Sequence, residues 1–310
     1  MHPIIHPVYE PTTGSWQYIV VCSTTNEAAI IDPVLDFDPS TATISTASAD
    51  TLLKVVSSKG YRVRYLLETH AHADHLTASF YLQQTLLQQE PPHHPEICIG
   101  NNIRQVQETV RLAYDIPTDE LSQSDFDHLF ADGAQFPLGQ LTVSVLALPG
   151  HTPDHIGYCI GPNVFTGDSI FNPDVGSARC DFPGGDARVL YRSMKRLLAL
   201  PGEWRLYTGH DYPPTTTSST GAGGEPPRDP VAFVTVAEQR ERNKHAKLES
   251  NEEEFVRWRS ERDRSLREPR LLHQALQVNV RAGRLPRRTD NGLVLLGYSV
   301  RFPEILVAGG

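Results

Sequence analysis

The sequence predicts an α/β fold, an αββα sandwich of two mixed β-sheets that pack face to face and are flanked by helices. Three observations support this prediction. Apolar segments with strand character fall into two successive sets, and segments of helical character lie between them. In addition, His70, Asp168 and His210 each follow directly on a predicted strand, where α/β folds commonly carry their sites.

The first set of predicted strands begins with a hairpin. Residues 17–22 and 28–33 are mostly apolar and predict two strands, and the polar residues 23–27 join them. Residues 36–49, rich in Asp, Ser, Thr, Ala and Pro, predict a loop, and Asp50 suits the N-cap of a helix over 51–59 that Gly60 ends. The other elements expected in this half are a buried strand at 63–67, a helix at 76–89, a short strand at 97–100 and a helix at 101–114.

The second set begins where Leu141, Val143 and Val145 alternate with polar residues, which is typical of a half-buried strand. The later elements expected here are strands at 156–160, 163–166 and 205–207 and a helix at 187–200.

The domain organisation is predicted from composition. Residues 1–212 are expected to form the catalytic core. Residues 213–230 are of low complexity and predict a surface loop or insertion. Residues 231–310 are expected to complete the same domain, with charged helices at 231–247 and 251–266 and short extended segments at 276–283 and 293–300.

Composition excludes several classes of protein. The net charge of -9 argues against a nucleic-acid partner, because phosphate binding needs a positive surface. The four cysteines are widely spaced and include no CxxC, which fits a reducing compartment. No basic region followed by an apolar core opens the chain, and no apolar run approaches the roughly 20 residues of a membrane helix. We therefore expect a cytoplasmic protein with no membrane partner; the segment 231–266 could pack on its own domain or form a homodimer.

Residues 68–75 hold four potential metal ligands within six positions: His70, His72, Asp74 and His75. Imidazole and carboxylate groups are ligands for Zn, Fe or Mn. The spacing does not suit one face of a helix, where ligands would lie three or four residues apart. It suits a loop that leaves a strand, so a strand, a ligand loop and a helix would hold a metal on rigid elements.

Three further candidate ligands occur later in the chain: His151 in a Pro-Gly-His-Thr turn, Asp168 in Thr-Gly-Asp-Ser and His210 in Gly-His-Asp-Tyr. In this order, after the pattern H-x-H-x-D-H, they resemble the ligand set of the metallo-β-lactamase superfamily. The fuller form of the first motif, residues 69–75, resembles the persulfide dioxygenase (sulfur dioxygenase) branch of that superfamily. Residues 168–186, 190–193, 209–212 and 277–283 are similar to the bacterial form of that branch.

The resemblance implies two alternative metal centres. In the superfamily at large, one metal would be held by His70, His72, His151 and Asp168, and a second by Asp74, His75, His210 and the shared Asp168. Two such Zn(II) ions suit hydrolysis. In the persulfide dioxygenase branch, the catalytic centre would be one Fe(II) per chain held by His70, His151 and Asp168, with positions open for O2 and substrate. The remaining four residues would then orient ligands and waters.

The resemblance also implies a substrate and its contacts. The expected activity is oxidation of a low-molecular-weight thiol persulfide, glutathione persulfide above all, with O2 to sulfite and thiol. Arg179 could bind a glutathione carboxylate, or it could pair with Asp181 and brace the loop. Tyr212 is a candidate for the substrate pocket. The alternatives are a dinuclear zinc hydrolase acting on thioesters (glyoxalase II-type) or lactones, and a non-catalytic metal-binding module.

Overall fold

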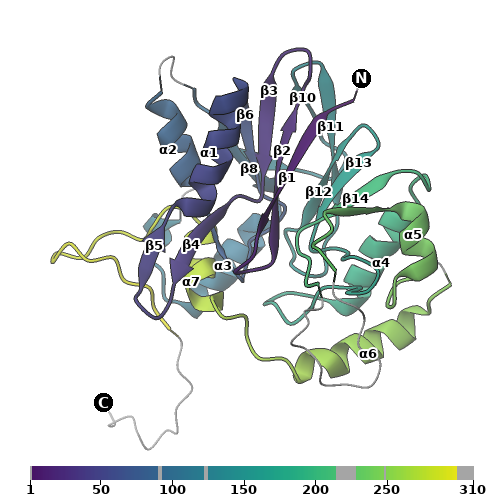
Figure 1. Ribbon diagram of the computed structural model, residues 1–310. Helices are drawn as coiled ribbons and strands as arrows, with labels where there is room; N and C mark the ends of the chain where they lie inside the picture. Colours follow the sequence, from purple (N-terminus) through teal and green to yellow (C-terminus); the bar gives the residue numbers. More distant parts are fainter. Residues whose placement is uncertain (1, 90–92, 122–124, 214–227, 248, 299–310) are drawn as a thin grey trace, which may run out of the picture.

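The computed structural model describes residues 2–89, 93–121, 125–213, 228–247 and 249–298, and it confirms the predicted α/β sandwich (Figure 1). Two six-stranded sheets lie in the middle of the molecule, and helices cover the outer face of each. Within these described ranges, no helix combines the length and the apolar character needed to cross a membrane.

The first sheet has the strand order β1-β2-β3-β6-β8-β9. Its first three strands are antiparallel, whereas β3, β6, β8 and β9 run parallel. All seven residues of β2 are buried, as expected for a strand that is covered on both faces. The strands are β1 (Ile4–Glu10), β2 (Ser15–Val21), β3 (Glu27–Ile31), β6 (Arg62–Leu67), β8 (Glu96–Gly100) and β9 (His128–Phe130).

The second sheet has the order β10-β11-β12-β13-β14-β15, with one parallel pair, β13 and β14. Aromatic side chains fill the space between the sheets; Tyr18, Phe165 and Tyr207 pack with ring centroids 4.9–5.5 Å apart. The strands are β10 (Gln135–Leu138), β11 (Leu141–Ala147), β12 (Ile156–Ile160), β13 (Asn163–Gly167), β14 (Arg205–Thr208) and β15 (Phe233–Thr235).

The helices form the two outer layers. Helices α1 (Ala47–Lys59), α2 (Ser79–Leu87), α3 (Ile103–Ala113) and α7 (Leu272–Asn279) contribute to the core on the first sheet. Helices α4 (Ala187–Leu198), α5 (Val236–Arg242) and α6 (Glu252–Arg264) contribute to the core on the second. Helix α4 illustrates why these segments are helical and pack on a sheet. Its buried side chains recur at helical spacing, and the Asp186 carboxylate caps its first turn.

The prediction of a loop at 36–49 is wrong. This segment forms part of β4 (Val34–Asp38), then β5 (Thr43–Ser45) and the first turn of α1, and with β7 (Leu76–Thr77) the two strands make a third small sheet. The helix begins at Ala47 and its N-cap is Thr46, whereas Asp50 lies inside the first turn. The polar composition reflects a surface hairpin: Asp38 accepts hydrogen bonds from Ser40 and Thr41 at its turn.

Other expectations also need correction. Residues 276–279 were expected to be extended but belong to helix α7. Residues 231–235 include a strand, β15, rather than the start of a helix, and 76–77 form β7 before α2 begins at Ser79. The helix predicted at 101–114 is confirmed as α3. Residues 214–227 of the low-complexity segment, and 299–300 of the predicted tail strand, lie outside the described residues.

Helix α7 ties the end of the chain to the ligand loop. Its last residue, Asn279, donates hydrogen bonds from its amide to the backbone carbonyls of His72 and His75, both at 2.8 Å. Its side-chain oxygen accepts from the backbone N–H of Thr77 at 2.8 Å. Three buried backbone groups of the segment 72–77 therefore depend on one amide that lies about 200 residues away in sequence.

We expect Asn279→Ala to lower the free energy of unfolding by about 2–4 kcal/mol, because it leaves buried backbone groups without partners. The measurement is denaturant unfolding of the metal-free protein. Asn291→Ala, at an exposed position of the tail, is the matched control and should change stability little. Equal stability of the two variants would show that this amide does not hold the loop.

Candidate metal centre

The candidate ligands lie beyond the carboxyl ends of strands that meet at one edge of the sandwich. His70 follows β6, His151 follows β11, and Asp168 and His210 follow β13 and β14. Since β13 and β14 run parallel, their ends carry Asp168 and His210 side by side. The positive φ of Gly167 (48°) and of Gly150 (130°) turns the chain just before Asp168 and His151.

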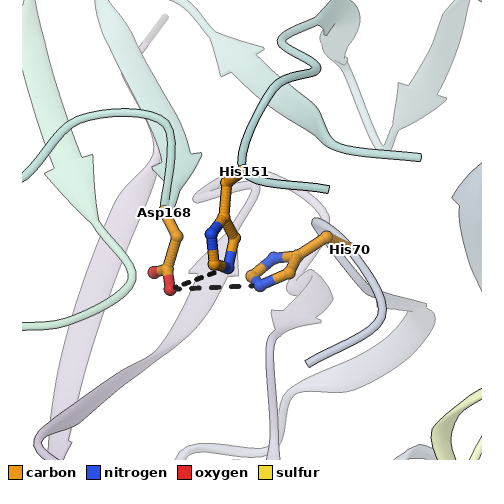
Figure 2. A group of neighbouring side chains, drawn as sticks. All are labelled: His70, His151 and Asp168. Carbon is orange, nitrogen blue, oxygen red and sulfur yellow. Dashed lines mark ion pairs between the residues drawn. The ribbon is translucent and has the colours of Figure 1, made fainter. Parts of the chain in front are cut away.

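His70, His151 and Asp168 converge on one point (Figure 2). The Nε2 atoms of His70 and His151 lie 4.0 and 3.7 Å from Oδ2 of Asp168. Donor atoms bound to one ion at about 2.1 Å lie roughly 3–4 Å apart, so these separations suit a single metal. All three side chains are buried.

Hydrogen bonds leave the metal-facing nitrogens of these two histidines unprotonated. Nδ1 of His151 donates to the carbonyl of Arg179 at 2.7 Å. The hydroxyl of Thr69 donates to Asp32, so it accepts from Nδ1 of His70 at 2.9 Å. In each ring the proton is on Nδ1, which leaves the Nε2 lone pair free. Burial, aided by the neighbouring His72 and His155, lowers the pKa of His70 well below its ordinary value.

A second group of ligand type consists of His72, Asp74 and His75. Nε2 of His72 donates to Asp32 at 3.1 Å, and Nδ1 of His75 donates to Asp74 at 3.0 Å. The other nitrogens, Nδ1 of His72 and Nε2 of His75, are buried and have no hydrogen-bond partner, as is Nε2 of His70. Unpartnered buried nitrogens are costly in a protein without a ligand, so these atoms fit a metal centre.

His210 lies between the two groups and links them. Its Nδ1 is 2.7 Å from Asp168 and its Nε2 is 2.8 Å from Asp74, and Ser15 lies 3.1 Å from the same Nε2. Although burial opposes its charged form, Asp168 and Asp74 together raise the pKa of His210 well above its ordinary value. An imidazolium that donates to both carboxylates accounts for this geometry.

Four buried side chains that support the ligands were not predicted from the sequence: Asp32, Glu68, Asp154 and His155. Asp32 accepts from the backbone N–H and hydroxyl of Thr69 and from His72. Glu68 accepts from Thr77 and Ser79 and lies 3.5 Å from His72. Burial opposes protonation of His72, but the two carboxylates outweigh it and raise its pKa well above the ordinary value.

His155 and Asp154 hold the other side of the centre. Nε2 of His155 accepts from the backbone N–H of Asp168 at 3.0 Å, and its ring stacks on His70 with centroids 4.6 Å apart. Burial and the nearby His151 lower the pKa of His155 to about 3, so it stays neutral at physiological pH. Asp154 accepts from the backbone N–H of Ala71 at 2.8 Å. The feature of the sequence that could have identified Asp154 and His155 is their position directly after the turn that carries His151.

A cavity of about 1010 Å³ leads from the protein surface to His75, His151, Asp168 and His210. The two residues predicted to contact substrate both line it. Tyr212 is 51% exposed, and its ring stacks on His210 with centroids 5.6 Å apart. The Arg179 guanidinium donates from Nε and Nη2 to Asp181, both at 2.5 Å. This is the bracing pair that the sequence offered as the alternative for Arg179.

The family model described as the Metallo-beta-lactamase superfamily matches residues 11–210, which include every candidate ligand. The chain belongs to the metallo-β-lactamase superfamily. The "Beta-lactamase hydrolase-like protein" of Xylella fastidiosa strain Temecula1 is 42% identical over 302 residues, and the match covers 97% of this chain but only 66% of the relative. "Glyoxylase B2" of Dictyostelium discoideum is 40% identical over 294 residues and matches over 93% of both chains.

More distant members support the branch suggested by the motifs. Human "Persulfide dioxygenase ETHE1, mitochondrial" is 27% identical over 283 residues, with 90% of this chain and 89% of that protein covered. The crystal structure of ETHE1 from Myxococcus xanthus superposes with a TM-score of 0.67 at 26% identity and covers 91% of this chain and 100% of that one. The resemblance to persulfide dioxygenases therefore extends over nearly the whole chain.

We expect Asp32→Asn to weaken metal binding by roughly 10- to 100-fold. The NH2 group of Asn would donate to the Thr69 hydroxyl, which in the wild type donates to the carboxylate. The hydroxyl would then donate to Nδ1 of His70, so the proton of this ring would move to Nε2, the metal-facing nitrogen. Asn tolerates the positive φ of 50° at this position. Chelator competition with Fe(II) and Zn(II) measures the affinity, and Asp127→Asn, distant from the ligands, is the control. Wild-type affinity in Asp32→Asn would contradict the role given to this carboxylate.

Proposed function

We propose that the protein is an Fe(II)-dependent persulfide dioxygenase that oxidises a low-molecular-weight persulfide, glutathione persulfide above all. Persulfide, O2 and one water give the thiol and sulfite with its protons, so that three oxygen atoms end on the terminal sulfur. The observation that carries this proposal is the convergence of His70, His151 and Asp168, two imidazoles and one carboxylate.

This donor set fits iron. Two histidines and one carboxylate on one face are typical of non-haem Fe(II) oxygenases. When bound there, Fe(II) would supply open positions for the substrate sulfur and O2. The cavity that reaches Asp168 and His151 gives both reactants access to those positions. A binding module without turnover would not require such access.

The protein's own groups prepare the site. Thr69 and the Arg179 carbonyl keep the lone pairs of His70 and His151 aimed at the centre. Asp74 and His210 form a hydrogen-bonded chain to Asp168 that can hold a proton beside the reacting groups. Ala73 and Phe171 line the cavity next to these polar groups and limit the water around them.

His210 also bears on the choice between one metal and two. Its Nδ1 is 2.7 Å from Asp168 and its Nε2 is 2.8 Å from Asp74, so the same imidazole can either link the two carboxylates beside a single metal or ligate a second metal that it shares with Asp74. In the single-metal proposal, His72, Asp74, His75 and His210 are groups that orient ligands and waters.

A second candidate function is a dinuclear zinc hydrolase of thioesters. The buried, unpartnered nitrogens of His72 and His75 favour it, because a second ion could displace the proton of His72 and bind there with Asp74. The relatives at 40–42% identity carry names of that kind, "Glyoxylase B2" and "Beta-lactamase hydrolase-like protein". For that function, His210 would have to release at least one of its carboxylates.

We expect the iron-loaded protein to consume O2 and form sulfite with glutathione persulfide, and to leave S-lactoylglutathione unhydrolysed. His151→Ala should lose tightly bound iron and lower the rate by roughly 10³-fold, since it removes one of three ligands. Oxygen-electrode and sulfite assays measure the rate, with His94→Ala, at an exposed histidine far from the cluster, as the control. Full turnover and iron content in His151→Ala, or thioester hydrolysis without O2 uptake, would contradict the proposal.

A further inference from the structure

The peptide group between Arg179 and Cys180 is hydrogen-bonded at both of its polar ends. Its carbonyl oxygen, which belongs to Arg179, accepts from Nδ1 of His151 at 2.7 Å. Its N–H, which belongs to Cys180, donates to Oδ2 of Asp263 on α6 at 3.0 Å. One planar unit therefore connects a candidate metal ligand to a carboxylate that lies 83 residues beyond Cys180 in the sequence.

The two hydrogen bonds of this peptide group reinforce each other. Because the peptide C–N bond has partial double-bond character, an N–H that donates to an anion makes the carbonyl oxygen of the same unit more negative. A more negative oxygen attracts the Nδ1 proton of His151 more strongly, and the Nε2 lone pair then becomes a better donor to a metal. A carboxylate bonded directly to a ligand histidine has the same effect; here a peptide group stands between the two.

Asp263 divides its two oxygens between two partners. Oδ2 accepts from the peptide N–H, and Oδ1 accepts from Nη2 of Arg259, one turn earlier on the same helix. Both side chains are buried. A hydrogen bond to a carboxylate is stronger than one to a neutral acceptor, so the contact with the peptide carries weight. Helix α6 itself packs on α4, where the ring of Phe255 contacts that of Tyr191 (Figure 1).

The loop around this peptide is also tied to the turn that carries His151. The backbone N–H of Asp186 donates to the carbonyl of Gly150 at 2.8 Å. Gly185 approaches so closely that a Cβ at this position would lie 2.3 Å from the carbonyl oxygen of Cys180 and 3.0 Å from that of His151. Glycine permits this approach because it has no side chain, so the peptide and the histidine keep fixed relative positions.

We infer that Asp263 is a positioning residue of the metal centre, which acts through the peptide 179–180 to hold the His151 proton on Nδ1 and to strengthen the bond from Nε2 to the metal. The inference goes beyond the proposed reaction, because it applies to iron and zinc alike. It rests on the proposed function only for the role of His151 as a ligand. Helix α6 thereby takes part in the metal centre although it carries none of the candidate ligands.

The test replaces the carboxylate with an amide that keeps the hydrogen bond to the peptide. In Asp263→Asn the side-chain oxygen can still accept from Cys180. In Arg259→Gln/Asp263→Asn a neutral amide pair replaces the buried ion pair, so this second variant leaves no arginine without its partner. Asp132→Asn is the matched control, because Asp132 also accepts from a backbone N–H, that of Ala147, and also pairs with an arginine.

We expect both α6 variants to bind Fe(II) and Zn(II) roughly 3- to 10-fold more weakly than wild type in chelator competition, less than the 10- to 100-fold loss typical of a group bonded directly to a ligand. Fe(III) depends more on a strong donor, so its affinity should fall further. A tenfold larger loss for Fe(III) than for Fe(II) raises the reduction potential of the bound iron by about 59 mV, which spectroelectrochemical titration measures. Asp132→Asn should keep its affinity within about twofold of wild type.

A purely structural role for Asp263 is separated by the His151→Ala background. If Asp263 acts through His151, adding Asp263→Asn to His151→Ala should change the residual Zn(II) affinity by less than about twofold. An equal loss of affinity in both backgrounds would overturn the inference, as would wild-type affinity and potential in both α6 variants. Oxygen uptake with glutathione persulfide decides the proposed function separately. A shifted potential in the variants without O2 uptake by the wild type overturns the dioxygenase alone, and O2 uptake with an unshifted potential overturns the role of Asp263 alone.

Discussion

The centre depends on the Asp32 carboxylate more than on any other single group. It lies at the end of β3, is almost fully buried, and accepts hydrogen bonds from the Thr69 backbone, the Thr69 hydroxyl and His72. Because it accepts the Thr69 hydroxyl proton, Thr69 must accept from Nδ1 of His70, which fixes the His70 proton on that nitrogen. Its hydrogen bond to Nε2 of His72 leaves Nδ1 of that ring facing the other ligands. A buried carboxylate that accepts three hydrogen bonds is rigid. Because Asp32 directly follows β3, these bonds fix the position of the ligand loop relative to the first sheet.

The second constraint is the arrangement of strand ends. His70 comes from the first sheet, whereas His151, Asp168 and His210 come from the second, so the centre exists only when the two sheets are packed together. Helix α7 adds a further restraint through Asn279, and α6 through Asp263. The C-terminal helices therefore contribute both to the metal loop and to the cavity that leads to it. The likeness to persulfide dioxygenases also continues beyond the residues 11–210 that the family model matches.

Much of this could be predicted from the sequence. The ligand candidates share compact motifs, and periodicity located most strands, because both signals are local. The supporting groups were missed because their contacts are not local. Asp32 forms a hydrogen bond with His72, 40 residues away in sequence, and Asn279 donates to the carbonyl of His72, 207 residues away. Residues 276–279 of helix α7 were expected to be extended because polar Gln277 and Asn279 obscure its buried face, although hydrogen bonds to Gly297, His72 and His75 satisfy both side chains. The hairpin at 36–45 was missed because its polar turn residues resemble a loop.

In the proposed centre, three ligands hold one metal while His210 links Asp168 to Asp74. Titration of metal-free protein with Fe(II), followed by metal analysis of the wild type and of His210→Gln, distinguishes this arrangement from a dinuclear centre. We expect one tightly bound iron per chain in both proteins, with slower persulfide oxidation in the variant. Two tightly bound metals in the wild type that fall to one in His210→Gln would contradict it, and would make His72, Asp74, His75 and His210 ligands of a dinuclear centre.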